Sequence, residues 1–211
     1  MTSFYLVRHA IHDLVDKCLV GRTDVALNEE GRRQALAAAE RLTGCGITAV
    51  QSSPRRRARE TAQAIGARLG LAVLSVPGMD EIDLGEWTGR SFADLEDDPL
   101  WKLWNAARAV AGPPGGETAE AVQRRAVAHL TGTAAATPAG RIVIVSHGEP
   151  IRAILLKAHG LSLDEWWRIT VEPAAINKVT VEGNRIVATG RSTQRDLNSL
   201  GATPGHAGAG A

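Results

Sequence analysis

The chain has 211 residues, of which 44% are hydrophobic, and this length and content suit a single α/β domain with a core of useful size. Its 24 Lys and Arg residues nearly balance 23 Asp and Glu residues, so the overall charge favours neither nucleic acid nor an anionic membrane as a partner. Cys18 and Cys45 lack CxxC spacing, the start is not of secretory type, and no window approaches the roughly 18 apolar residues of a membrane span. We therefore expect a cytoplasmic protein with reduced, structural thiols.

The first predicted strand ends in two polar residues. Residues 4–7 form a short apolar run, and Arg8 and His9 follow it directly. Such a run predicts a buried strand whose carboxyl end delivers a cation and an imidazole to the open edge of a sheet, where ligands bind in α/β proteins. Residues 11–27 have no clear period and contain turn residues around Gly21, so we expect a loop over the site.

Two helices separated by a strand come next. Asn28 is predicted to cap the first helix, whose buried face would consist of Ala35, Leu36, Ala39 and Leu42. A strand at residues 47–50 leads to Ser53 and Pro54, which suit the N-cap and the first position of a second helix that runs to about residue 69.

The middle of the chain is less regular. A third short strand is predicted at residues 71–76, and the pattern of residues 91–109 is helical but interrupted by a proline. Trp101 and Trp104 lie one turn apart in that segment. They are interpreted as core residues, with the alternative that residues 90–115 form a cap or lid over the site.

A second strand resembles the first in design. After a turn cluster and a long helix, together residues 112–136, the apolar run at residues 141–146 ends in His147 and Gly148. Two strands therefore each deliver one histidine, and a helix over residues 149–159 follows.

The last predicted elements are a hairpin or two edge strands at residues 176–181 and 185–188. From residue 198 onward Gly, Ala, Pro and Ser prevail, with little to bury. We expect one domain over residues 1–197 and a disordered tail over residues 198–211.

Four motifs occur in the order found in one known family. Arg8-His9-Ala10 is similar to Arg-His-Gly, residues 53–58 match Ser-Pro-x-x-Arg-Ala, residues 81–89 match Glu-x-x-x-Gly-x-x-x-Gly, and Ser146-His147-Gly148 matches Ser-His-Gly. By these motifs the chain resembles the histidine phosphatase superfamily (branch 1), which includes the phosphoglycerate mutases. The resemblance implies a three-layer α/β/α sandwich with a mostly parallel central sheet.

The candidate site residues suit phosphoryl transfer. Arg8 and Arg57 offer planar guanidinium forks for phosphate oxygens, whereas Arg55, Arg56 and Arg59 are expected at the surface. His9 as a neutral imidazole would attack phosphorus and form a phosphohistidine, and His147 would donate to the transferring group.

The resemblance assigns proton delivery to the leaving group to Glu81. This role requires a raised pKa, which partial burial beside a dianion would provide. The competing carboxylates are Asp83, Glu86 and Glu117.

Substrate binding is assigned to Arg8, Arg57, Gly148, His12 and Arg22. The family usually has Gly, Thr or Ser, and Asn where this chain has Ala10, His12 and Val15, so His12, Asp13 or Arg22 would replace missing phosphate contacts. Arg22 is alternatively a surface arginine. Of the other histidines, His129 and His159 are expected to be solvated or to cap a helix, and His206 lies in the tail.

Three functions remain open at this stage. We favour a phosphatase that acts on a small phosphorylated metabolite; a phosphomutase and a non-catalytic phospholigand-binding module are the alternatives. The histidines lack HxxxH or HExxH spacing, so we expect no metal and no cofactor. The apolar Trp166-Trp167 pair either packs internally or forms the face of a homodimer.

Overall fold

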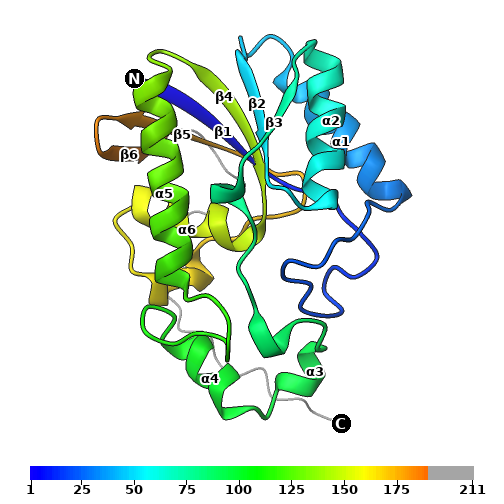
Figure 1. Ribbon diagram of the computed structural model, residues 1–211, viewed down its shortest axis with the longest axis vertical. Helices are drawn as coiled ribbons and strands as arrows, with labels where there is room; N and C mark the ends of the chain where they lie inside the picture. The colour runs from blue at the N-terminus through cyan, green and yellow to red at the C-terminus, as the bar shows by residue number, and fades with distance from the viewer. Residues whose placement is uncertain (190–211) are drawn as a thin grey trace.

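A six-stranded sheet forms the centre of the computed structural model, which describes residues 1–189 (Figure 1). The strand order is β3-β2-β4-β1-β5-β6, and the pairs β3·β2, β2·β4 and β4·β1 are parallel. The strands are β1 (Thr2–Arg8), β2 (Ala49–Ser52), β3 (Val73–Ser75), β4 (Arg141–Ser146), β5 (Ile176–Glu182) and β6 (Arg185–Ala188). The predicted mostly parallel sheet is confirmed. The expected tail, residues 198–211, and the expected domain end at residue 197 lie outside the described residues.

Helices cover both faces of this sheet and make the three predicted layers (Figure 1). Alternate residues of β4 point to opposite faces: Ile142 and Ile144 pack with α5 and α6, whereas Val143 and Val145 pack with α1 and α2. Both faces of the parallel strands are thus apolar, as such strands require. The covering helices are α1 (Glu29–Leu42), α2 (Arg56–Leu69), α5 (Ala119–Ala136) and α6 (Gly148–Ala158).

Shorter elements cross the carboxyl edge of the sheet. They are the 3-10 turns η1 (Pro77–Met79), η2 (Gly85–Trp87) and η3 (Leu163–Arg168) and the helices α3 (Phe92–Leu95) and α4 (Pro99–Ala106). Pro99 begins α4 and separates it from α3, because proline fits the first turn of a helix but not its interior. β5 and β6 form the predicted antiparallel hairpin, which adds to the sheet beside β1.

Two local predictions are wrong. Leu36 is 60% exposed, because the buried face of α1 uses small residues instead: Gly31, Ala35, Ala38, Ala39 and Leu42. Ser53 does not cap α2, which begins at Arg56 after Arg55 without a side-chain cap. The Ser53 hydroxyl is instead bonded to the carboxylate of Asp80. The predicted cap of α1 is confirmed, since Asn28 accepts a hydrogen bond from the Gly31 amide.

The carboxyl ends of three parallel strands meet at one edge of the sheet. The last residue of β1, Arg8, is paired with Ser146, the last residue of β4, so the next residues along both strands are the two histidines. The amide of Ser53, just after β2, donates to the Val145 carbonyl of β4. This register places the residues that follow β1, β2 and β4 side by side. Within residues 1–189, no helix combines the length and the apolar character that crossing a bilayer requires.

Candidate active site

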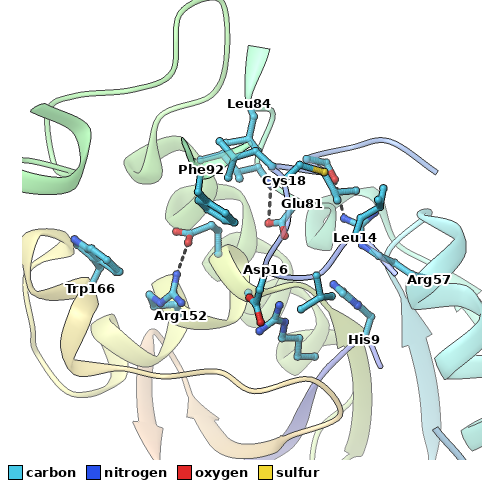
Figure 2. A pocket seen from close by; sticks show the side chains of 18 of the residues that line it. His9, Leu14, Asp16, Cys18, Arg57, Glu81, Leu84, Phe92, Arg152 and Trp166 are labelled. Atoms are coloured by element: carbon cyan, nitrogen blue, oxygen red, sulfur yellow. Dashed lines mark hydrogen bonds and ion pairs between the residues drawn. The ribbon is translucent and has the colours of Figure 1, made fainter. Parts of the chain in front are cut away.

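A pocket of about 330 Å³ opens at this edge and separates two kinds of lining residue. Figure 2 shows His9 and Arg57 on one side of it and Arg152 and Trp166 on the other. We call the first side the inner end, which comprises Arg8, His9, His12, Arg57, Glu81 and Gly148. Of the eight site residues predicted from the sequence, these six line the pocket, and His147 lies directly behind His9 with 5.1 Å between the ring centroids.

His9 is held as a neutral ring with a defined proton position. Its Nδ1 lies 2.9 Å from the carbonyl oxygen of Ala10, and a carbonyl can only accept, so Nδ1 carries the proton and Nε2 keeps its lone pair. Burial, with the charges of Arg57 and Arg8, lowers the pKa of His9 well below 6.5. A neutral imidazole with a free Nε2 is the form that can attack phosphorus.

Arg8 and Arg57 are anchored by backbone carbonyls. Arg8 Nη1 donates to Val171 O at 2.7 Å, and Arg57 donates from its two terminal nitrogens to Thr23 O and Gly21 O at 2.8 and 2.7 Å. The Nε of each arginine is buried and has no hydrogen-bond partner among the described residues. Buried donors without partners are costly and call for an explanation. A bound oxyanion would supply the missing acceptors.

The amino terminus of α6 adds to this positive environment. His147 is its N-cap residue and gives no side-chain cap, so the first amides of the helix, from Gly148 onward, have no partner from the capping side chain. Such a helix end favours a negative charge. The pocket residue Gly148 thus lies where the resemblance placed it.

Glu81 is buried, and its protonation is suited to an acid. Burial raises the pKa of Glu81 to about 7, against the lowering effect of the Arg57 charge and with a further raising contribution from Glu149. Its Oε1 accepts from the Ile82 amide at 2.9 Å, which fixes the side chain. The carboxyl group is therefore protonated in a large fraction of molecules near neutral pH.

The glycine motif that follows Glu81 positions this segment. A Cβ at Gly85 would lie 2.1 Å from the Pro114 carbonyl, and the φ of Gly85 is +49°, so only glycine permits the close approach. The Glu86 amide donates to the same carbonyl at 3.0 Å. The competing carboxylates lie elsewhere: Glu86 is exposed, and Asp83 and Glu117 both bind Arg22.

His12 lies against His9 as a second neutral imidazole. The two rings are stacked with 5.3 Å between centroids. His12 Nδ1 accepts from the Leu14 amide at 3.2 Å, so the proton of the neutral ring is on Nε2. Burial, with the Arg57 and Arg8 charges, lowers the pKa of His12 to about 4. The ring can offer an N–H donor in place of the hydroxyl that the family usually has.

Two arginines lie in places that differ from the expectation. Arg22 is not among the residues that line the pocket: it binds Asp83 and Glu117 at 3.3 and 3.0 Å and the Glu81 carbonyl at 3.0 Å, and its contact with substrate stays a prediction. Arg55 is not a free surface charge, because it binds Asp80 through Nε and Nη2. Arg56 and Arg59 are exposed as predicted.

His129 also differs from its prediction. The Nε2 of His129 is 2.7 Å from Oε1 of Gln51 in β2. The His129 side chain is half-buried rather than solvated, and this burial lowers its pKa. His159 is the C-cap residue of α6, as expected.

The outer wall of the pocket consists of the residues opposite the inner end, none of which the sequence analysis named as a site residue: Phe92, Trp101, Trp104, Arg108, Glu149, Arg152 and Trp166. The guanidinium of Arg108 lies between two indole rings, 3.8 Å from the centroid of Trp104 and 3.9 Å from that of Trp166. It also donates to Glu149 at 2.9 Å. The only sequence signal was the pair of tryptophans one turn apart. Trp104 packs in a core cluster, as expected, and also borders the pocket.

The segment predicted as a cap or lid, residues 90–115, supplies five pocket residues: Phe92, Trp101, Trp104, Asn105 and Arg108. It therefore lies against the pocket; its movement stays a prediction. Among residues 1–189, no group of three or more His, Cys, Asp or Glu side chains is arranged to hold a metal ion.

Comparison with known proteins agrees with this geometry. The family model described as histidine phosphatase superfamily (branch 1) matches residues 4–192. A glucosyl-3-phosphoglycerate phosphatase of Mycobacterium tuberculosis is 34% identical over 171 residues, which cover 76% of this chain and 77% of that protein. A bifunctional protein of the same organism is 32% identical over 204 residues, covering 95% of this chain but 54% of that protein. The chain thus spans about half the length of this relative.

Solved structures share the same arrangement. A mycobacterial glucosyl-3-phosphoglycerate phosphatase in complex with VO3 has a TM-score of 0.82 at 28% identity, covering 91% of this chain and 99% of that one. A phosphoserine phosphatase from Entamoeba histolytica has a TM-score of 0.82 at 25% identity, covering 93% and 100% of the two chains.

Proposed function

Since the chain belongs to the histidine phosphatase superfamily (branch 1), we propose that it is a metal-independent phosphatase that hydrolyses a small-metabolite phosphomonoester through a phosphohistidine intermediate. One observation carries this proposal: His9, whose Nε2 is unprotonated, lines the same pocket as Arg8 and Arg57, whose buried Nε atoms have no hydrogen-bond partner within residues 1–189. Such donors, together with a nucleophile and an acid, supply charge stabilisation without a metal ion.

The residues divide the reaction into two balanced steps. In the first, His9 Nε2 forms a bond to phosphorus while the ester P–O bond breaks, and protonated Glu81 gives its proton to the leaving oxygen. In the second, Glu81 as carboxylate takes a proton from water, whose oxygen bonds to phosphorus and releases His9 and inorganic phosphate. Arg8, Arg57, His12 and the amino terminus of α6 would hold the phosphoryl oxygens in both steps.

The outer wall suggests the nature of the leaving group. Four aromatic side chains, Phe92, Trp101, Trp104 and Trp166, line it, and the cavity of about 330 Å³ is at the small end for a ligand site. We therefore propose a phosphomonoester whose organic part is compact and has an apolar or planar surface. Relatives named for glucosyl-3-phosphoglycerate and phosphoserine indicate that the substrates of such proteins differ.

A phosphomutase is the second candidate, because a probable phosphoglycerate mutase of Cronobacter sakazakii is 28% identical over 193 residues. A mutase would retain the phosphohistidine and pass the group to another hydroxyl. The homodimer and the cytoplasmic location stay predictions: Trp166 packs against the core, whereas Trp167 is 47% exposed.

The test is phosphate release from a panel of alkyl and aryl phosphomonoesters in the presence of a chelator. We expect wild-type activity to survive chelation and His9→Ala to lose about 1,000-fold or more of it. His159→Ala, which alters a half-buried histidine outside the pocket, is the matched control and should retain activity.

The same samples separate the alternatives. Transfer of label between two hydroxyls without net release would favour the mutase, and binding without either reaction would favour a phospholigand-binding module. Activity that chelation abolishes, or that His9→Ala retains, would contradict the proposed function.

A further inference from the structure

A chain of hydrogen bonds runs from His147 into the protein, away from the pocket. His147 Nε2 is 2.7 Å from Ser53 Oγ, and Ser53 Oγ is 3.1 Å from Asp80 Oδ1. All three residues are buried. None of the four sequence motifs assigns a role to Asp80, and the only structural role predicted for Ser53 is that of a helix cap.

The direction of each hydrogen bond follows from the groups available. Arg55 binds the Asp80 carboxylate through Nε at 2.9 Å and Nη2 at 2.8 Å, so this carboxylate is paired as an anion and can only accept. Ser53 has a single hydroxyl proton, which it donates in a hydrogen bond to this carboxylate. Ser53 Oγ must then accept from its other neighbours, His147 and the Arg55 amide at 3.3 Å.

The proton of neutral His147 is therefore on Nε2. Its Nδ1 keeps the lone pair, is buried without a partner among the described residues, and lies 3.9 Å from Oε2 of Glu81. Burial and the Arg57 charge lower the pKa of His147 well below 6.5, so the neutral form prevails in the free protein. The sequence analysis expects His147 to donate to the transferring group. The ring can donate from Nδ1 only after that atom takes up a proton.

We propose that Asp80 and Ser53 are positioning residues that hold His147 in the Nε2–H form, so that Nδ1 is the atom that takes up a proton when a phosphoryl group binds. The catalytic meaning rests on the proposed function. A phosphomonoester monoanion brings the proton: transfer to Nδ1 leaves a phosphoryl dianion beside an imidazolium, and no other reactant is needed. The Asp80 carboxylate, through Ser53, stabilises the imidazolium.

The experiment reads the ring directly in the free protein by ¹⁵N NMR of the histidines, with His147 assigned from the spectrum of His147→Gln. We expect a single tautomer with a protonated Nε2 and a bare Nδ1 in the wild type. Inorganic phosphate, the probe, should convert Nδ1 to the protonated form.

Ser53→Ala removes the acceptor and should produce a mixture of tautomers, and Asp80→Asn should do the same because the amide no longer fixes the direction of the Ser53 proton. Ser52→Ala is the matched control: Ser52 is also buried, but its hydroxyl donates to the Ser53 carbonyl and is not the acceptor for His147. It should leave the ring signals unchanged. Thermal melting shows which variants are folded. If Ser53→Ala does not fold, the tautomer is tested in Asp80→Asn instead.

Kinetics adds a second readout. Ser53→Ala should lower kcat about tenfold or more with little change in KM, because the arginines that hold the phosphoryl group remain. A protonated Nδ1 in the free wild-type protein, or an unchanged tautomer in both folded variants, would overturn the proposal. The tautomer is measured without substrate. An inactive protein would therefore refute the proposed function, and the NMR measurement would still decide whether Ser53 and Asp80 hold His147 in the Nε2–H form.

Discussion

The inner end and the outer wall of the pocket are built by different means. The inner end stands on the sheet: β1, β2 and β4 end there, and His9, Ser53 and His147 follow those strands directly. The outer wall consists of side chains from segments outside the sheet, with Phe92 and Trp104 in the predicted lid segment (residues 90–115) and Trp166 in η3.

The arginines of the two regions also differ in their partners. At the inner end Arg8 and Arg57 donate to backbone carbonyls rather than to carboxylates, and burial lowers the pKa of both. At the outer wall the cations are paired internally, because Arg108 and Arg152 both bind Glu149. Buried cations that no carboxylate neutralises favour an anion at the inner end, whereas cations paired with a carboxylate favour an uncharged surface at the outer wall. Under the proposed function, phosphoryl transfer takes place at the carboxyl edge of the sheet, and substrate choice depends on the loops.

The largest effect expected at the inner end, beyond loss of His9, follows from Glu81→Gln. The glutamine keeps the hydrogen bond to the Ile82 amide but cannot donate the catalytic proton, so kcat/KM for alkyl phosphates, which reports the first step, should fall about 100-fold or more. Aryl phosphates, whose leaving groups need no proton, should lose much less. Steady-state kinetics on both classes measures the difference, and Glu86→Gln, at an exposed neighbour, is the control.

The pH profile sharpens the same prediction. The acid must be protonated, and the pKa of Glu81 is about 7, so wild-type activity on alkyl phosphates should fall as the pH rises through about 7. This alkaline limb should disappear in Glu81→Gln. An equal loss of kcat/KM on alkyl and aryl phosphates would show that Glu81 is not the acid.

At the outer wall the strongest expected effect comes from Arg108→Met. The change removes a buried cation from between Trp104 and Trp166. It also removes the ion pair of Arg108 with Glu149, which connects the predicted lid segment to α6. We expect the free energy of unfolding to fall by about 2–3 kcal/mol and KM for aryl phosphates to rise, while kcat changes little. Denaturant unfolding and kinetics measure the two effects.

Arg90→Met is the control for that variant, since Arg90 lies in the same segment but pairs with Asp98 near the surface at 3.5 Å. A surface pair of this kind contributes about 1 kcal/mol or less. Equal effects of the two variants would mean that the sandwiched guanidinium has no special part in docking the lid segment.

The same division explains what the sequence could predict. Apolar runs that end in histidine mark the strands and the inner end, because a strand and its last residue are local in sequence. Which arginine of residues 55–57 faces the pocket depends on where α2 begins. Arg57 lines the pocket, whereas Arg55, expected at the surface, binds Asp80. The contacts of Arg108 with Glu149 and Trp166 span 41 and 58 positions and depend on loop conformation, which no local period encodes.

The smallest effect is expected at His12, where the inner end meets the loop of residues 11–27. Its Nε2–H is one donor among several, so His12→Ala should weaken inhibition by inorganic phosphate and lower kcat/KM about tenfold, in line with about 1.4 kcal/mol for a hydrogen bond to a charged group. His12→Thr should recover part of the loss through its hydroxyl. Because the pKa of His12 is about 4, the ring is neutral between pH 5 and 8, and its removal should shift the activity uniformly over that range. A loss confined to low pH would instead show that His12 acts as a cation, and the stacked histidine would then belong to the charged machinery of the inner end.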